Sequence, residues 1–304
     1  LITSSAASDV YKRQIFSMSD NFFELLQAPE PLKIVGTINA YSALLAKKNG
    51  HKAIYLSGAG VANASFGLPD LALTSRDNVV EDLRRIKGVV DTPILVDCDT
   101  GWGSGLNISK TLKEMISAGA DAVHLEDQVS EKRCGHRPGK EIVSEEEMVD
   151  RIKAAKDSIT KKDFMLMART DSFSKEGINS VIDRSNAFIE AGADSIFPEA
   201  ITKLDDYLKI SENVNAPILA NITEFGLTPL YKADELKDVG VKMILYPLSA
   251  FRAMSKAAEE IYIALNETNS LEKKLKKMQS RDELYDVLNY HMYEKKIDEL
   301  FSKE

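Results

Sequence analysis

The feature that most constrains the fold is an alternation of short apolar runs with amphipathic segments along residues 32–265. Runs typical of strands occupy residues 32–38, 53–56, 93–96, 122–125, 164–168, 194–197, 217–220 and 243–245. Helical spacing of apolar residues, such as Val79, Leu83 and Ile86, fills many of the gaps. Alternation favours a parallel sheet. About eight such units in about 250 residues favour an α/β fold that closes into a (β/α)8 TIM-type barrel.

A short repeat supports this reading. Ala-Gly-Ala-Asp occurs at residues 118–121 and again at 191–194, each time just before a predicted strand. We interpret it as the helix-to-strand joint of a repeated unit. A doubly wound open sheet is the alternative, but it should show a Gly-x-Gly-x-x-Gly turn after the first strand, and this sequence has none there.

The barrel does not account for the whole chain of 304 residues. We expect residues 18–265 to form the catalytic barrel. Residues 266–304, rich in lysine and acids around Leu284, Val287 and Leu288, are expected to form C-terminal helices, either as a solvated cap or as a subunit contact. Residues 1–17 show no amphipathic period, so we expect a disordered tail or a sequence artefact, with Met18 as the start.

Composition excludes several classes of protein. A formal net charge of -8 argues against a nucleic-acid binder. No apolar stretch approaches the ~20 residues of a membrane span. The two cysteines, Cys98 and Cys134, make no disulfide framework, which favours a reducing compartment such as the cytoplasm.

Polar residues gather at the C-terminal ends of the predicted strands, where barrel enzymes build their sites. They are Ser57, Asp97, Asp99, Glu126, Arg169, Glu199, Asn221 and Thr223. Asp97, Asp99 and Glu126 would repel one another unless a cation lay between them. Hard oxygen ligands suit Mg²⁺, and Mn²⁺ would fit the same set. The alternative is that Asp99 caps the helix after Gly105.

The basic and neutral groups suggest an anionic ligand. Arg169 and Arg252 can each hold a carboxylate by two parallel hydrogen bonds. Asn221 and Thr223 add neutral donors, and residues 57–59 offer backbone amides. A substrate with several carboxylates needs this mixture, although Arg252 could instead form an ordinary surface salt bridge.

The segment after the fourth predicted strand, residues 126–138, concentrates reactive side chains. A thiol can transfer a proton near neutral pH when cations lie beside it, and Lys132, Arg133 and a protonated His136 would be such cations for Cys134. Gly135 would let the backbone approach a ligand closely. A polar surface loop with an incidental cysteine is the competing interpretation.

The run Lys-Arg-Cys-Gly-His at residues 132–136 resembles the catalytic loop of the isocitrate lyase family. Residues 125–151 resemble most the 2-methylisocitrate lyase family, and the resemblance extends from about residue 22 to 301. Isocitrate lyases usually carry Lys-Lys-Cys-Gly-His and a long insertion. Phe197 and Leu245 stand where isocitrate lyases carry bulkier side chains, which leaves room for an extra methyl group. Ser-Gly-Ala at residues 57–59 replaces a more usual Ser-Gly-Gly, which could shift the substrate.

The resemblance implies Mg²⁺-dependent cleavage of 2-methylisocitrate to pyruvate and succinate, a step of propionate catabolism. It implies that Asp97 and Asp99 hold the ion, that Glu126 joins through water, and that Asp70 helps to hold the site. It also implies a homotetramer that exchanges C-terminal helices.

The parts suggest roles in such a cleavage. Cys134 is the candidate acid, with Lys132, His136 and Arg137 setting its ionisation, and Tyr55 is the candidate base. The expected substrate-binding residues are Ser57, Gly58, Ala59, Cys134, Gly135, Arg169, Glu199, Asn221, Ile222, Thr223 and Arg252. The alternatives are an isocitrate lyase, a mutase or oxaloacetate decarboxylase of the wider phosphoenolpyruvate mutase superfamily, and a catalytically silent barrel.

Overall fold

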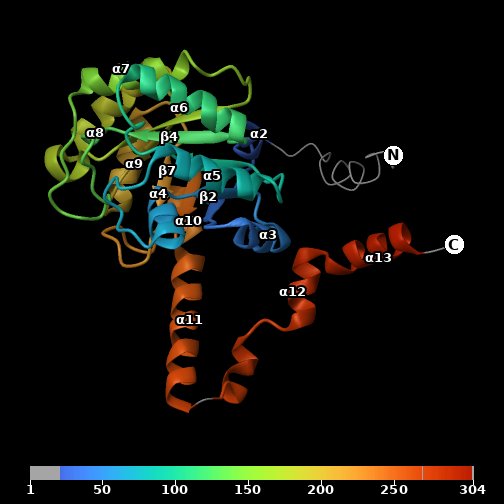
Figure 1. Ribbon diagram of the computed structural model, residues 1–304. Coiled ribbons are helices and arrows are strands. Elements are labelled where there is room, and N and C mark those ends of the chain that lie inside the picture. The colour runs from blue at the N-terminus through green and yellow to red at the C-terminus, as the bar shows by residue number, and fades with distance from the viewer. Residues whose placement is uncertain (1–20, 269, 303–304) are drawn as a thin grey trace.

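A computed structural model describes residues 21–268 and 270–302. Its centre is an eight-stranded parallel sheet in the order β6-β5-β4-β3-β2-β1-β8-β7, wrapped by helices (Figure 1). The strands are β1 (Leu32–Gly36), β2 (Ala53–Leu56), β3 (Ile94–Asp97), β4 (Ala122–Glu126), β5 (Met165–Thr170), β6 (Ser195–Pro198), β7 (Leu219–Asn221) and β8 (Met243–Tyr246). A bridge between Ile196 and Ile218 joins β6 to β7, so the predicted (β/α)8 barrel is confirmed.

Helices follow the strands around the barrel. They are α2 (Phe22–Leu25), α3 (Ala40–Lys48), α4 (Gly58–Gly60), the π-helix η1 (Val61–Ser65), α5 (Arg76–Lys87), α6 (Gly105–Ala118), α7 (Glu145–Lys156), α8 (Phe173–Glu190), α9 (Leu204–Asn213), α10 (Ala233–Asp238) and α11 (Ser249–Thr268). The additional C-terminal helices are the 3-10 helix η2 (Glu272–Lys277), α12 (Arg281–Leu288) and α13 (Tyr290–Phe301).

The strand period of two decides which side chains fill the barrel and which pack against the helices. In β2, Ala53 and Tyr55 point inward, whereas Ile54 and Leu56 join the layer under the helices. Phe22 of α2 is fully buried in the interior cluster and closes the N-terminal end of the barrel. The opposite, C-terminal end is therefore the open mouth.

The two copies of the Ala-Gly-Ala-Asp motif have the same structural role, because the aspartate of each accepts a hydrogen bond from a backbone amide of the preceding strand. Asp121 accepts a hydrogen bond from the amide of Ile94 at 3.1 Å, and Asp194 accepts one from the amide of Leu166 at 2.8 Å. Each aspartate thus ties the start of its own strand to the start of the preceding strand. Gly119, which ends α6, adopts a φ of 102°, a conformation that glycine accepts without strain.

Two local hydrogen-bonding arrangements begin helices near the mouth. Residues 58–65, directly after β2, form α4 and η1, and the Ser57 side chain accepts from the Gly60 amide. At the start of α7, Ser144 accepts from the Glu147 amide, and the Glu147 carboxylate pairs with Arg151.

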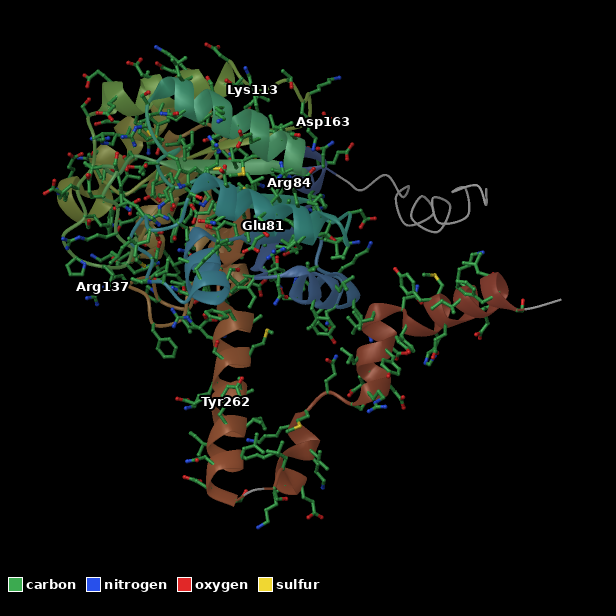
Figure 2. All side chains as sticks on the ribbon, viewed as in Figure 1. Glu81, Arg84, Lys113, Arg137, Asp163 and Tyr262 are labelled. Carbon is green, nitrogen blue, oxygen red and sulfur yellow. The ribbon has the colours of Figure 1, made fainter. Side chains whose placement is uncertain are left out.

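Figure 1 shows α11 running away from the barrel, after which the chain turns back and α12 packs against α3. Tyr262 on α11 is 72% exposed (Figure 2). Residues 1–17, expected to be a tail or artefact, lie outside the described residues. No helix in the described part of the chain is long and apolar enough to cross a membrane.

Candidate active site

A cavity of about 270 Å³ lies at the C-terminal ends of the strands. The structure brings most of the predicted site residues to its wall. They are Tyr55, Ser57, Ala59, Asp70, Asp97, Lys132, Cys134, Gly135, His136, Arg169, Phe197, Glu199, Asn221, Thr223, Leu245 and Arg252. Side chains from seven strands, β2 to β8, and the loops that follow them thus converge on one mouth, as expected for a barrel enzyme.

Three acids cluster next to this cavity, and one of them, Asp97, lines it. Asp97, Asp99 and Glu126 are all buried, and each offers an oxygen within 4.8 Å of the others. Oε1 of Glu126 has no hydrogen-bond donor among the described residues, whereas Oε2 of Glu126 lies 3.3 Å from Arg169 and Oδ1 of Asp99 lies 2.7 Å from Lys132. A buried cluster of anionic oxygens, one of them without a donor, fits a hard divalent cation such as Mg²⁺. Asp99 is not a helix cap, because α6 begins after Ser104.

Burial and mutual repulsion also shift the pKa values of these acids. Burial raises the pKa of Asp99 to about 6, with Asp97 adding to the shift against the opposing effect of Lys132. Burial likewise raises the pKa of Glu126 well above its usual range. For Asp97, burial acts in the same direction, but His124, Lys132 and Arg169 outweigh it and lower the pKa. A bound cation would relieve the repulsion behind the two raised values.

Lys132 is held by two of the acids. Its Nζ lies 2.5 Å from Asp70 Oδ1 and 2.7 Å from Asp99 Oδ1. Burial opposes the charge, yet Asp99, Glu126 and Asp70 together raise the pKa of Lys132, so it stays an ammonium. Asp70, whose role could not be derived from the sequence, therefore links the loop after η1 to the loop after β4.

Arg169 is fully engaged by protein carboxylates. It forms a two-bond pair with Asp171, at 2.9 and 3.2 Å, and approaches Glu126 Oε2 at 3.3 Å and Glu199 Oε2 at 3.2 Å. A Cβ at Gly135 would fall 2.5 Å from Arg169 and from Glu199, so only glycine lets the loop lie this close. The close approach expected of Gly135 is made to these two side chains.

The predicted activation of Cys134 by neighbouring cations is wrong. Lys132 faces acids, and Arg133 donates to the carbonyl of Pro138. Burial, aided by the charges of Asp70 and Glu199, raises the pKa of the Cys134 thiol against the opposing effects of a hydrogen bond from the His136 amide and the charge of Arg169. Cys134 is therefore a protonated thiol at neutral pH, which suits a proton donor and not a nucleophilic thiolate.

The environment of Tyr55 counts against its predicted role as a base. Its hydroxyl lies 3.2 Å from Asp97 Oδ2 and 2.9 Å from His124 Nε2. Burial, followed by the charge of Asp97, raises the pKa of Tyr55 well above its usual value. The two contacts are compatible when His124 donates to Tyr55 and Tyr55 donates to Asp97.

His136 bridges the loop after β4 and the loop after β7. Its Nδ1 accepts from the amide of Leu227 at 3.0 Å, and its Nε2 lies 3.2 Å from Glu199 Oε1 and 3.3 Å from Asn221 Nδ2. Arg137, the next residue, is exposed at the mouth (Figure 2).

Arg252 lies across the mouth, its guanidinium carbon 5.7 Å from the ring centroid of Phe225. No carboxylate pairs with it among the described residues, so the alternative of a surface salt bridge is wrong.

Two predicted substrate-binding groups are not brought to the cavity. Ile222 is buried in the layer beneath the helices, and its amide donates to the carbonyl of Leu245. The amide of Gly58 donates to Asp97 Oδ2 at 3.0 Å, so it is not free for a ligand.

Sequence reasoning also missed residues that touch the site. His124, two residues before Glu126 on the same inward face of β4, was detectable from the strand period. Asp171, which holds Arg169, directly follows the strand end. Glu224 lines the cavity and accepts from Ser249 at 2.5 Å, and nothing in the sequence pattern singled it out.

Known proteins extend this picture. The phosphoenolpyruvate phosphomutase family profile matches residues 22–265. A protein of Vibrio cholerae named 2-methylisocitrate lyase is 57% identical over 279 residues, covering 90% of this chain and 91% of its own. An Escherichia coli protein with the same name is 54% identical over 283 residues, covering 93% and 96%.

Solved structures agree on the fold. Oxaloacetate acetylhydrolase superposes with a TM-score of 0.86 at 26% identity, covering 94% of this chain and 97% of its own. A 2,3-dimethylmalate lyase superposes with a TM-score of 0.82 at 29% identity, covering 99% and 96%. The chain is therefore an enzyme of the phosphoenolpyruvate phosphomutase family and belongs, within it, to the 2-methylisocitrate lyases.

Proposed function

We propose that this enzyme cleaves 2-methylisocitrate to pyruvate and succinate with the help of Mg²⁺, as a step of propionate catabolism. The observation that carries the proposal is one cavity lined both by the protonated thiol of Cys134 and by Asp97, behind which Asp99 and Glu126 complete the acid cluster. The names of the relatives at 57% and 54% identity support the choice of substrate.

The reaction breaks one carbon–carbon bond in the retro-aldol sense. The substrate hydroxyl gives its proton to a base, its carbon becomes the ketone of pyruvate, and the bonding electrons remain on the other fragment. That fragment is the enediolate of succinate, which must gain a proton. Mg²⁺ held by Asp97 and Asp99, with Glu126 through water, would polarise substrate oxygens and offset their developing charge.

The chain's own residues supply the remaining steps. The Cys134 thiol, which keeps its proton at neutral pH, gives that proton to the enediolate carbon. Arg252 stands at the mouth as a cation without a carboxylate partner among the described residues, so we assign it to a terminal carboxylate of the substrate. Asn221, Thr223 and the amide of Ala59 add neutral donors. Arg169, already paired with acids, would have to exchange one of them to bind substrate.

We assign the discrimination against isocitrate to the cavity wall that Phe197 and Leu245 share. Both side chains are almost fully buried, and Phe197 packs with its edge against the ring of His124, with ring centroids 5.4 Å apart. A methyl-sized space in such a wall changes the relative rates by ~10–200-fold. Isocitrate cleavage thus remains the alternative function, reduced rather than abolished.

We further propose that residues 266–304 contribute to a homotetramer. Apolar side chains within residues 266–304 are exposed in the single chain, including Leu275 (60%), Ile297 (54%) and Phe301 (76%). Burial of such residues against other subunits would remove them from water. A cytoplasmic location agrees with Cys98 and Cys134 being unpaired in the described residues.

The test is product analysis with purified protein, Mg²⁺ or EDTA, and four substrates: 2-methylisocitrate, isocitrate, phosphonopyruvate and oxaloacetate. We expect pyruvate from the first, at least tenfold slower glyoxylate formation from the second, no turnover of the others, and none in EDTA. Faster glyoxylate formation would move the assignment to isocitrate lyase. Turnover of oxaloacetate or phosphonopyruvate alone would move it to a decarboxylase or mutase.

A further inference from the structure

The turn after β7, residues 223–227, reaches across the cavity mouth to the loop that carries Cys134. The amide of Leu227 donates to His136 Nδ1 at 3.0 Å. Gly226 lies against the same imidazole, because a Cβ built on it would stand 3.0 Å from Nδ1. On its other side the imidazole faces Glu199 and Asn221 through Nε2.

These contacts distinguish the forms of His136. A neutral imidazole has one donor nitrogen and one acceptor nitrogen, and an imidazolium has two donors. With the proton on Nε2, Nδ1 accepts from Leu227, and the Nε2–H group lies beside Glu199 Oε1, 3.2 Å away. With the proton on Nδ1, two N–H groups would face each other at Leu227, and Glu199 would lose the Nε2–H group while still accepting from the Ala200 amide and Asn221. Only the contact with Asn221 would improve, because an unprotonated Nε2 could accept a hydrogen bond from Asn221 Nδ2. The imidazolium meets the same conflict at Leu227.

We propose that the 223–227 turn is a positioning element, in which the amide of Leu227 donates to Nδ1 and thereby fixes the tautomer of His136 that carries its proton on Nε2. His136 then presents a hydrogen-bond donor to the cavity wall. The part of the inference that concerns catalysis rests on the proposed lyase function; the protonation state of His136 does not.

Gly226 offers a probe of the turn that leaves every polar group in place. Its φ lies outside the left-handed region, so alanine is compatible with the backbone. The added methyl, however, would lie 2.7 Å from Thr223 Cγ2 and 3.0 Å from His136 Nδ1, and it must displace one of them. Gly105→Ala is a matched control, since its Cβ would meet only Ala154 at an ordinary 3.4 Å.

The experiment is long-range ¹H–¹⁵N correlation spectroscopy of protein labelled with ¹⁵N-histidine. The chain has four histidines, and a His136→Gln variant assigns the signal. We expect wild-type His136 to show a protonated Nε2 and an unprotonated Nδ1 at pH 7. Gly226→Ala should give a mixture of protonation states and a kcat about 10–100-fold lower, with a smaller change in KM. Gly105→Ala should match wild type in both measurements.

Two results would overturn the inference. One is a wild-type His136 with its proton on Nδ1 or on both nitrogens, and this spectrum decides the point even if Gly226→Ala fails to fold. The other is a folded Gly226→Ala variant with an unchanged His136 spectrum. A wild-type spectrum as expected, in protein that cleaves no methylisocitrate, would keep the positioning role and reject the proposed function.

Discussion

Removing Mg²⁺ should destabilise the folded protein measurably, because the acid cluster buries charge that a cation would neutralise. Two ionised carboxylates 4.8 Å apart repel by about 3.5 kcal/mol at an effective dielectric constant of 20. Lys132 neutralises part of this by pairing with Asp99. A ligand present at 100 times its Kd stabilises the native state by about 2.7 kcal/mol. For a chain of 304 residues, with an unfolding entropy of about 2.1 cal/mol/K per residue, that corresponds to a rise in Tm of roughly 4 °C.

The assay is thermal unfolding in EDTA and at increasing Mg²⁺ concentration, for wild type and for Asp97→Asn. Asparagine keeps the size of the side chain but removes the charge, so the variant should lose the Mg²⁺-dependent rise in Tm. Asp77→Asn is the control, because the Asp77 side chain is 78% exposed and lies away from the cavity. The metal assignment would be refuted if the Tm of the wild type did not change with Mg²⁺ concentration, or if the Tm of Asp97→Asn rose by the same amount.

Three further predictions follow from the same site. Cys134→Ser should lower kcat by ~10²–10⁴-fold with little change in KM, since a serine hydroxyl is a much weaker acid; steady-state kinetics checks this, and retained kcat would remove Cys134 as the proton donor. Phe197→Trp should shrink the methyl space and shift the ratio of kcat/KM values by ~10-fold or more towards isocitrate, and an unchanged ratio would place the discrimination elsewhere. Mg²⁺ affinity should be constant above about pH 7 and weaken below about pH 6, because the raised pKa of Asp99 lets protons compete with the metal there; calorimetric titration between pH 5 and 8 measures this, and a flat profile would contradict it.

The strand period explains why so much of this site was predictable. Along β4, Ala122, His124 and Glu126 take successive inward positions, so a polar residue that continues an inward apolar series must reach the mouth. The same logic places Asp97 after Leu95 and Asn221 after Leu219. The acid cluster and the barrel therefore follow from local spacing.

What the sequence could not provide is the pairing between loops. The cations around Cys134 were counted as its neighbours because they are adjacent in the chain, whereas Lys132 turns to Asp70, 62 positions away. The contact from Leu227 to His136 spans 91 positions. Ile222 illustrates the converse: it lies between two residues of the cavity wall, and the strand period turns its side chain outward. Contacts between distant loops depend on the closed barrel, which spacing alone does not position.

The most direct test of the account is to measure by NMR the amounts of pyruvate and succinate formed from 2-methylisocitrate. Both the wild type and Cys134→Ser are assayed with Mg²⁺ present. The account predicts pyruvate and succinate in equal amounts from the wild type, and almost none from the variant. Intact 2-methylisocitrate in the wild-type sample, or equal rates from both proteins, would contradict it.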